Sequence, residues 1–83
     1  MRIIFTKHAE KKFGFLKELG FNIKRGFVEE SLKNPSKIQK GYSGTKVILK
    51  KIDETHNLRI VYSDEGGIIT VITFYPVRKD RYD

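Results

Sequence analysis

The sequence contains no cysteine, which excludes a disulfide scaffold, a thiolate zinc site and a cysteine nucleophile. Its two histidines, His8 and His56, cannot form a dense metal site by themselves, although carboxylates could add ligands. No apolar run approaches the roughly 20 residues of a membrane-spanning helix. Lys7 and Glu10 follow the short apolar start too closely for a signal peptide. We therefore expect a soluble, cytoplasmic protein without a metal, another cofactor or a membrane partner.

The length of the chain predicts one small domain over residues 1–83. A chain of this size buries only a little over ~60% of its unfolded surface, so its core must be small. Hydrophobic residues make up 39% of the sequence and aromatic residues 12%, which is enough for a packed core and argues against wholesale disorder.

Positive charge dominates the composition, with 17 Lys and Arg residues against 10 Asp and Glu residues and a net charge of +7. Solubility alone is one interpretation, and a polyanionic partner such as RNA or an acidic protein is the other. The segment from Ser31 to Ile52 carries lysines and Tyr42 but no acidic residue, which favours the polyanion. Within it we interpret three lysines as contacts to an RNA backbone, or as protection of an edge strand against aggregation: Lys46, Lys50 and Lys51.

The first half of the chain has the periodicity of one strand and two helices. Residues 2–5 form a short apolar strand, and Thr6 is placed to cap a helix that ends at Gly20. The apolar stripe of that helix includes Leu19. Asn22 is placed to cap a second helix over residues 23–33, which Pro35 ends.

The second half has strand periodicity. Four strands are predicted over residues 36–42, 45–52, 58–62 and 68–75, with Pro76 ending the last one. Polar turns separate them, the strongest at residues 63–67. The predicted fold is therefore α+β: one strand, two helices and a four-stranded antiparallel meander. We expect the first strand to lie beside the last one and both helices to cover one face of the sheet.

Five short motifs occur in an order that resembles the small RelE-like toxins and the wider barnase–EndoU–colicin–RelE group of ribonucleases. They are TKHAEKKF at residues 6–13, NP at 34–35, LRIVY at 58–62, VITFYP at 71–76 and RY at 81–82. The resemblance covers nearly the whole chain. It implies a RelE-like fold, a metal-independent ribonuclease directed at mRNA on the ribosome or at tRNA, and an acidic antitoxin protein as partner. Lys12 departs from the pattern, because relatives often have arginine there and lysine lacks bidentate geometry.

His8 is the strongest candidate for acid–base chemistry. It lies in the first turn after Thr6, where free backbone amides and the helix dipole attract a phosphate and favour a neutral imidazole. Lys11 and Lys12 follow one turn later on the same side, where they could bind RNA. The alternative is a partly buried histidine that bonds to the backbone.

Arg59 is the one charge in an apolar strand and points away from Leu58 and Ile60. A guanidinium fixed on a sheet face suits a scissile phosphate, and an ion pair across the sheet or simple exposure is the alternative. Thr73 and Tyr75 share one face of the last predicted strand, so Tyr75 lines the active-site cleft in one interpretation and belongs to the core in the other.

The resemblance also implies catalytic roles for three residues after the last strand, Arg78, Arg81 and Tyr82, whereas a solvated, frayed end is the alternative. His56 lies in a polar turn, where a structural role is expected. The sequence thus predicts a toxin-like endoribonuclease. A non-catalytic RNA-binding or regulatory protein, and a module that binds an acidic protein, are the competing hypotheses.

Overall fold

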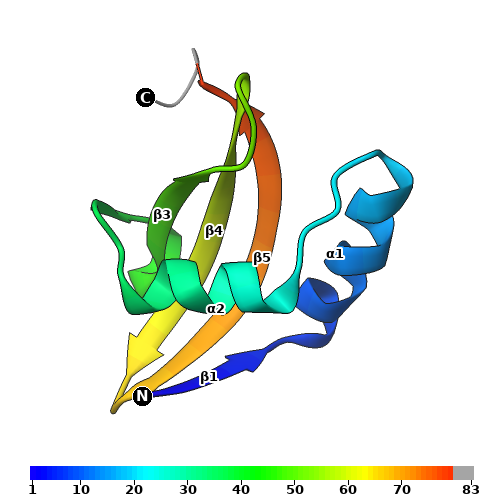
Figure 1. The fold of residues 1–83 in the computed structure, drawn as a ribbon. Coiled ribbons are helices and arrows are strands. Elements are labelled where there is room, and N and C mark those ends of the chain that lie inside the picture. Colours follow the sequence, from blue (N-terminus) through cyan, green and yellow to red (C-terminus); the bar gives the residue numbers. More distant parts are fainter. Residues whose placement is uncertain (80–83) are drawn as a thin grey trace.

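The computed structural model describes residues 1–79 as two helices and a five-stranded sheet, an α+β arrangement (Figure 1). In chain order the elements are β1 (Arg2–Phe5), α1 (Lys7–Glu18), α2 (Arg25–Lys33), β2 (Ile38–Lys40), the 3-10 turn η1 (Tyr42–Gly44), β3 (Lys46–Lys51), β4 (His56–Glu65) and β5 (Ile68–Arg78).

The strand order in the sheet is β1-β5-β4-β3-β2. Strands β2 to β5 form an antiparallel meander, in which the turn between β4 and β5 contains Gly66 and Gly67, both at positive φ. Strand β1 pairs in parallel with β5, from Arg2 opposite Ile68 to Phe5 opposite Val71. The predicted meander and the predicted place of the first strand are therefore confirmed.

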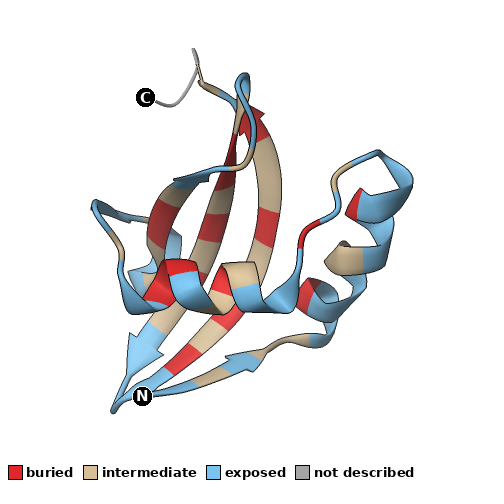
Figure 2. Cartoon of the chain, viewed as in Figure 1, coloured by how far each residue is buried: buried red, intermediate tan, exposed pale blue. Residues whose placement is uncertain are grey.

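Both helices contribute to a core on one face of the sheet. Helix α2 passes in front of β3, β4 and β5, and α1 stands beside β5 (Figure 1). Phe13 of α1 packs between Phe5 of β1 and Phe74 of β5, with ring centroids 5.7 and 4.8 Å apart. Buried residues, red in Figure 2, lie along the sheet and on both helices. The core cluster comprises Ala9, Leu16, Ile23, Val28, Leu32, Ile48, Leu58, Ile60, Tyr62, Ile69, Val71 and Phe74.

Strand β4 separates the two faces of the sheet by simple alternation. Leu58, Ile60 and Tyr62 are buried in the core, whereas Arg59 and Val61 are only half-buried and point to the opposite face. This alternation confirms the predicted direction of Arg59.

A β-bulge in β5 changes which residues reach that opposite face. Val61 pairs with Thr73, but the next residue, Tyr62, pairs with Val71, so Ile72 is an extra residue. Without the bulge, strict alternation from the buried Val71 would turn Thr73 toward the core. The bulge therefore brings Thr73 to the face that Arg59 occupies.

Thr6 joins the start of α1 to this bulge. Its hydroxyl oxygen accepts a hydrogen bond from the Ala9 amide (3.1 Å), as predicted for a helix cap. The same hydroxyl donates to the carbonyl of Ile72 (3.0 Å), and the Thr6 amide donates to the carbonyl of Val71 (3.0 Å). Thr6 thus follows β1, caps α1 and hydrogen-bonds to the bulged strand through both its backbone and its side chain.

The end of α1 agrees with the prediction in its glycine but not in its apolar stripe. Gly20 has φ +95°, the left-handed conformation expected after a helix. Leu19, predicted to belong to the stripe, is 59% exposed, because the helix ends at Glu18 and the cap residue turns away from the core.

Helix α2 begins later than predicted, at Arg25, and its N-cap is Lys24 rather than Asn22. Ile23 stays outside the helix, yet it is buried in the core. The Arg25 guanidinium lies 4.5 Å from the ring centroid of Phe5 and forms an ion pair with Glu10 of α1. These tertiary contacts fix the helix start, whereas the sequence signal rested on local capping alone.

Strand boundaries also shift. Only Ile38–Lys40 of the predicted strand 36–42 pairs, because the chain turns at Tyr42–Gly44. Strand β4 extends to both sides of 58–62. Pro76 does not end β5 but lies within it, opposite Leu58. In the described part of the chain, β1 pairs with β5 only as far as Val71. At Pro76 no described strand lies beside β5 on the side away from β4, so the missing backbone amide of proline costs no hydrogen bond there.

No helix within residues 1–79 is long and apolar enough to cross a membrane.

We expect Thr6→Ala to lower the free energy of unfolding by about 2 kcal/mol, because it removes a helix cap and a side-chain hydrogen bond to the strand. Thr6→Ser keeps the hydroxyl and should cost less than about 1 kcal/mol. Urea denaturation of the two variants and the parent chain measures the difference. Equal stability of the alanine and serine variants would contradict this role of Thr6.

Asp53 organises the turn between β3 and β4. One of its carboxylate oxygens accepts hydrogen bonds from the backbone amides of Thr55 (2.8 Å) and His56 (2.7 Å). The bond from the Thr55 amide, aided by His56 and by the Thr55 hydroxyl, lowers the pKa of Asp53 from 3.8 to about 2. The ionised form is therefore favoured in the folded chain.

This lowered pKa predicts an acid-sensitive contribution to stability. It should be fully present above about pH 4 and be lost as the pH falls toward about 2, because the folded state then binds a proton that the unfolded state already holds. Asp53→Asn should flatten the pH dependence of the unfolding free energy in that range. Glu54→Gln, which removes a neighbouring charge in the same turn, is the control. If both variants retain the acid slope of the parent, the effect does not come from Asp53.

Candidate functional site

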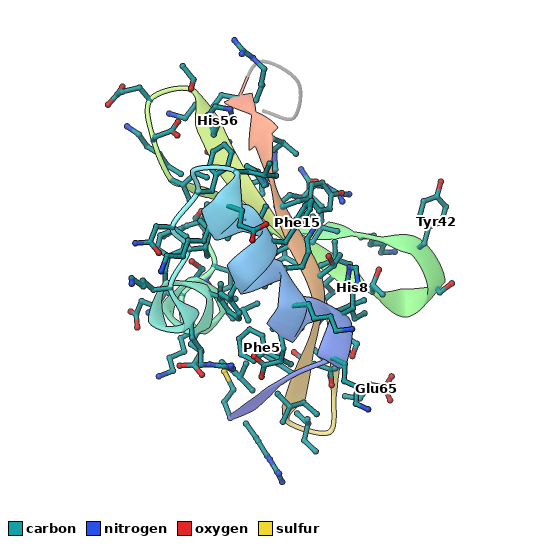
Figure 3. The ribbon with its side chains drawn as sticks, turned by 90° about the vertical axis from the view of Figure 1, so that its right-hand side faces the viewer. Phe5, His8, Phe15, Tyr42, His56 and Glu65 are labelled. Carbon is teal, nitrogen blue, oxygen red and sulfur yellow. The ribbon has the colours of Figure 1, made fainter. Side chains whose placement is uncertain are left out.

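His8 lies at the edge of the sheet face that the helices leave uncovered. Viewed along the sheet, α2 is on one side, the turn with Tyr42 is on the other, and His8 lies at the start of α1 on the side of Tyr42 (Figure 3). The side chain is exposed, and its Nε2 atom is 3.2 Å from the hydroxyl of Thr73. The alternative of a partly buried histidine bonded to backbone does not describe this geometry.

Arg59 lies on the same face, directly opposite Tyr75 in the β4–β5 ladder. Its guanidinium donates a hydrogen bond to the Tyr75 hydroxyl and lies 5.6 Å from the centroid of that ring. Arg59 is half-buried, so the sheet and its neighbours restrict the guanidinium more than they would at a loop. Such a cation is suited to binding an anionic oxygen.

Thr73 and Tyr75 connect these two groups. They are two residues apart on β5 and share a face, which separates them by about 7 Å along the strand. His8 contacts the first and Arg59 contacts the second. An imidazole from the helix and a guanidinium from the central sheet therefore flank one short stretch of β5.

Two lysines of α1 border this stretch. The Lys12 ammonium lies 5.8 Å from the centroid of the Tyr75 ring and 5.5 Å from that of Phe15. A shallow hollow of about 280 Å³ is lined by His8, Lys11, Lys12 and Phe15, the last of which is 55% exposed. The predicted placement of both lysines on the side of His8 agrees with this lining. Cation–π contacts hold Lys12 near the tyrosine without neutralising its charge.

A larger hollow of about 440 Å³ begins at Arg59 and extends toward the 3-10 turn. Val61 and Ile72 contribute apolar surface to it, and Tyr42 stands at its border with 94% of its surface exposed. The complete lining is Lys40, Gly41, Tyr42, Thr45, Val47, Arg59, Val61 and Ile72.

The structure does not bring Arg78 to this face. Arg78 pairs with His56, and its position in the alternation of β5 matches that of Phe74, on the side of the helices. The predicted catalytic residues Arg81 and Tyr82 lie outside the described residues. Of the predicted catalytic set, His8 and Arg59 are therefore the pair that the described structure brings together.

The three lysines of β3 do not form one surface with that pair. Lys46 and Lys50 alternate with Val47 and therefore point to the other side of the sheet, and Lys46 forms an ion pair with Asp64 (3.7 Å). Lys51 shares the side of Arg59, but its ammonium is 3.7 Å from the Glu54 carboxylate. If these lysines bind RNA, they do so away from His8.

The sequence pattern leaves Tyr75 between the cleft and the core and gives Thr73 and Tyr42 no role in the site. The bulge and the contact with Arg59 put Thr73 and Tyr75 on the face of Arg59. Tyr42 carried a signal, since it is the aromatic residue within the lysine-rich segment. His56 lies elsewhere, against Phe21 at 5.1 Å between ring centroids and bonded to Asp53.

No group of three or more potential metal-ligating side chains of the His, Asp and Glu types gathers within residues 1–79. The chain matches no protein-family model, no curated protein and no solved structure. The resemblance to RelE-like toxins thus stays a prediction, and the site has to be judged on its own geometry.

Proposed function

We propose that this protein is a metal-independent endoribonuclease with a RelE-like scaffold. The observation that carries the proposal is the convergence of His8 and Arg59 on Thr73 and Tyr75, on the face without helices. A general base or acid and a fixed cation beside the same short stretch of strand are the minimal equipment for cleaving RNA through its own 2′-hydroxyl. The net charge of +7 supports a polyanionic substrate.

The proposed reaction is an internal transfer of the phosphoryl group. Neutral His8 takes the proton from the 2′-hydroxyl, whose oxygen then bonds to phosphorus while the bond from phosphorus to the 5′-oxygen breaks. Arg59 stabilises the charge on the non-bridging oxygens. The Tyr75 hydroxyl, which accepts from Arg59, donates its own proton to the leaving oxygen, and the guanidinium stabilises the resulting phenolate.

This mechanism predicts that the protein cleaves RNA but not DNA, because DNA lacks the attacking 2′-hydroxyl. The products are a 2′,3′-cyclic phosphate and a 5′-hydroxyl. The resemblance suggests mRNA on the ribosome or tRNA as targets and an acidic antitoxin protein as a partner. Cleavage assays with isolated ribosomes and with tRNA test the proposed targets. Binding to an acidic protein encoded nearby tests the proposed partner.

Cleavage of a labelled single-stranded RNA in the presence of a metal chelator tests the proposal. His8→Ala should reduce the cleavage rate by roughly 10²–10⁴-fold, because it removes the acid–base group. Arg59→Gln should reduce it by roughly 10²–10³-fold, because it removes a donor to the developing charge. Replacing the riboses with 2′-deoxyriboses should abolish cleavage.

His56→Gln is the matched control, since it replaces the other histidine, which contacts Phe21 and Asp53 instead of the site. It should cleave RNA at the parent rate. Unchanged cleavage by His8→Ala and Arg59→Gln would indicate a contaminating nuclease and contradict the proposal, whereas loss of activity in all three variants would indicate a general folding defect. Intact RNA with the parent protein, on and off the ribosome, would exclude catalysis. Salt-sensitive RNA binding would then favour the RNA-binding protein, and salt-sensitive binding of an acidic protein alone would favour the interaction module.

Lys12 should contribute to RNA affinity through one phosphate contact, because its ammonium is held beside Tyr75. Lys12→Gln should weaken binding of single-stranded RNA at low salt and reduce the slope of log K against log salt by about 1. Lys17→Gln, in the last turn of the same helix, is the control for the loss of one charge. Equal slopes for the two variants would show that Lys12 acts only through the overall charge.

A further inference from the structure

Tyr42 is an exposed aromatic side chain on a well-defined backbone. It is 94% exposed, and Figure 3 shows it projecting from the turn. Its carbonyl accepts hydrogen bonds from the Thr45 amide (3.0 Å) and the Thr45 hydroxyl (2.7 Å). The chain reverses through Ser43 and Gly44, both in the left-handed region with φ +55° and +77°. A non-glycine residue in that region is uncommon, so this turn has a specific shape.

The turn is also pressed against the sheet. The Gly41 amide donates to the carbonyl of Thr45 (2.9 Å), which closes the turn. A Cβ atom at Gly41 would collide with the Thr45 hydroxyl and lie 3.3 Å from the Val47 side chain. Val47, on the face opposite the helices, is only 1% exposed as a result. The hydrogen bonds and this close approach hold Tyr42 at a fixed place beside the hollow.

The hollow between Tyr42 and Arg59 combines an apolar surface with a cation. Its volume of about 440 Å³ lies in the range of roughly 300–1,000 Å³ that is typical of small-molecule sites. Val61 and Ile72 supply apolar side chains, and Arg59 supplies positive charge. A flat apolar ring attached to an anion matches this pattern.

We propose that this hollow binds one unpaired base of a single-stranded RNA, stacked on Tyr42, while its phosphate lies toward Arg59. The inference rests on the proposed function in taking RNA as the ligand, and it gives Tyr42 the role of selecting unpaired nucleotides. Bases in a duplex are stacked on each other and cannot enter such a site. Every base can stack on an aromatic side chain, so the site distinguishes single strands from duplexes but does not distinguish one base sequence from another.

Equilibrium binding tests the inference without any need for cleavage. The ligand is a fluorescent 2′-O-methyl oligoribonucleotide, which keeps its bases and phosphates but cannot be cut through a 2′-hydroxyl. Tyr42→Ala should weaken its binding by roughly ten-fold, because stacking of one base is lost. Tyr42→Phe keeps the ring and should bind within about two-fold of the parent. A strand of abasic ribose phosphates should bind the parent and Tyr42→Ala equally.

Equal affinity of Tyr42→Ala and the parent for the base-bearing strand would overturn the inference. Tighter binding of the duplex than of the single strand would overturn it too. Because Tyr42 is exposed, its substitution should leave the fold intact. Circular dichroism spectra of the variants that match the parent spectrum exclude misfolding as the cause of weaker binding. If the parent cleaves RNA but Tyr42→Ala binds the oligonucleotide as tightly as the parent, the base site is excluded and the proposed catalysis stands. If Tyr42→Ala weakens binding but the parent cleaves no RNA, the base site stands and the proposed catalysis is excluded.

Discussion

The junction at Thr6 is the constraint on which the rest of the site depends. Its amide and hydroxyl bind two successive carbonyls of β5, at Val71 and at the bulged Ile72, and its hydroxyl also caps α1. These three bonds set where the helix begins and how it meets the sheet. His8 reaches Thr73 because it follows Thr6 by two residues and Thr73 follows the bulge by one. A helix start and a strand irregularity thus position each other.

The two faces of the sheet differ in the side chains that they carry. The helices and the apolar residues of β4 and β5 occupy one face, where Phe74 and Leu58 are fully buried. On the other face Arg59 pairs with Tyr75 and His8 pairs with Thr73, and these four side chains stay at least partly accessible. Substitutions of these residues should therefore lower stability less than substitutions in the core.

The sequence predicted the class of fold and the direction of Arg59, because alternation in β4 and the cap at Thr6 are local signals. It could not predict the bulge, since β5 is apolar or β-branched on both faces and such a strand carries no register information. For the same reason, the sequence did not place Tyr75 on the face of Arg59. Pro76 lies within the strand because β1 ends earlier, which only the paired sheet reveals. The resemblance implied Arg78 as part of a tail after the last strand, but β5 extends to Arg78, and the alternation of that strand turns it to the side of the helices.

The parallel pairing of β1 with β5 has a consequence for biosynthesis. Strand Arg2–Phe5 leaves the ribosome before its partner Ile68–Val71, which is synthesised more than sixty residues later. Until then α1 has no strand on which Thr6 can anchor it, and His8 and Arg59 remain unassembled. Contacts between distant parts of a chain form slowly. A nascent polypeptide therefore lacks the contacts of His8 and Arg59 with β5 until that strand has been made, so an RNA-cleaving protein of this design would leave its own message untouched until then.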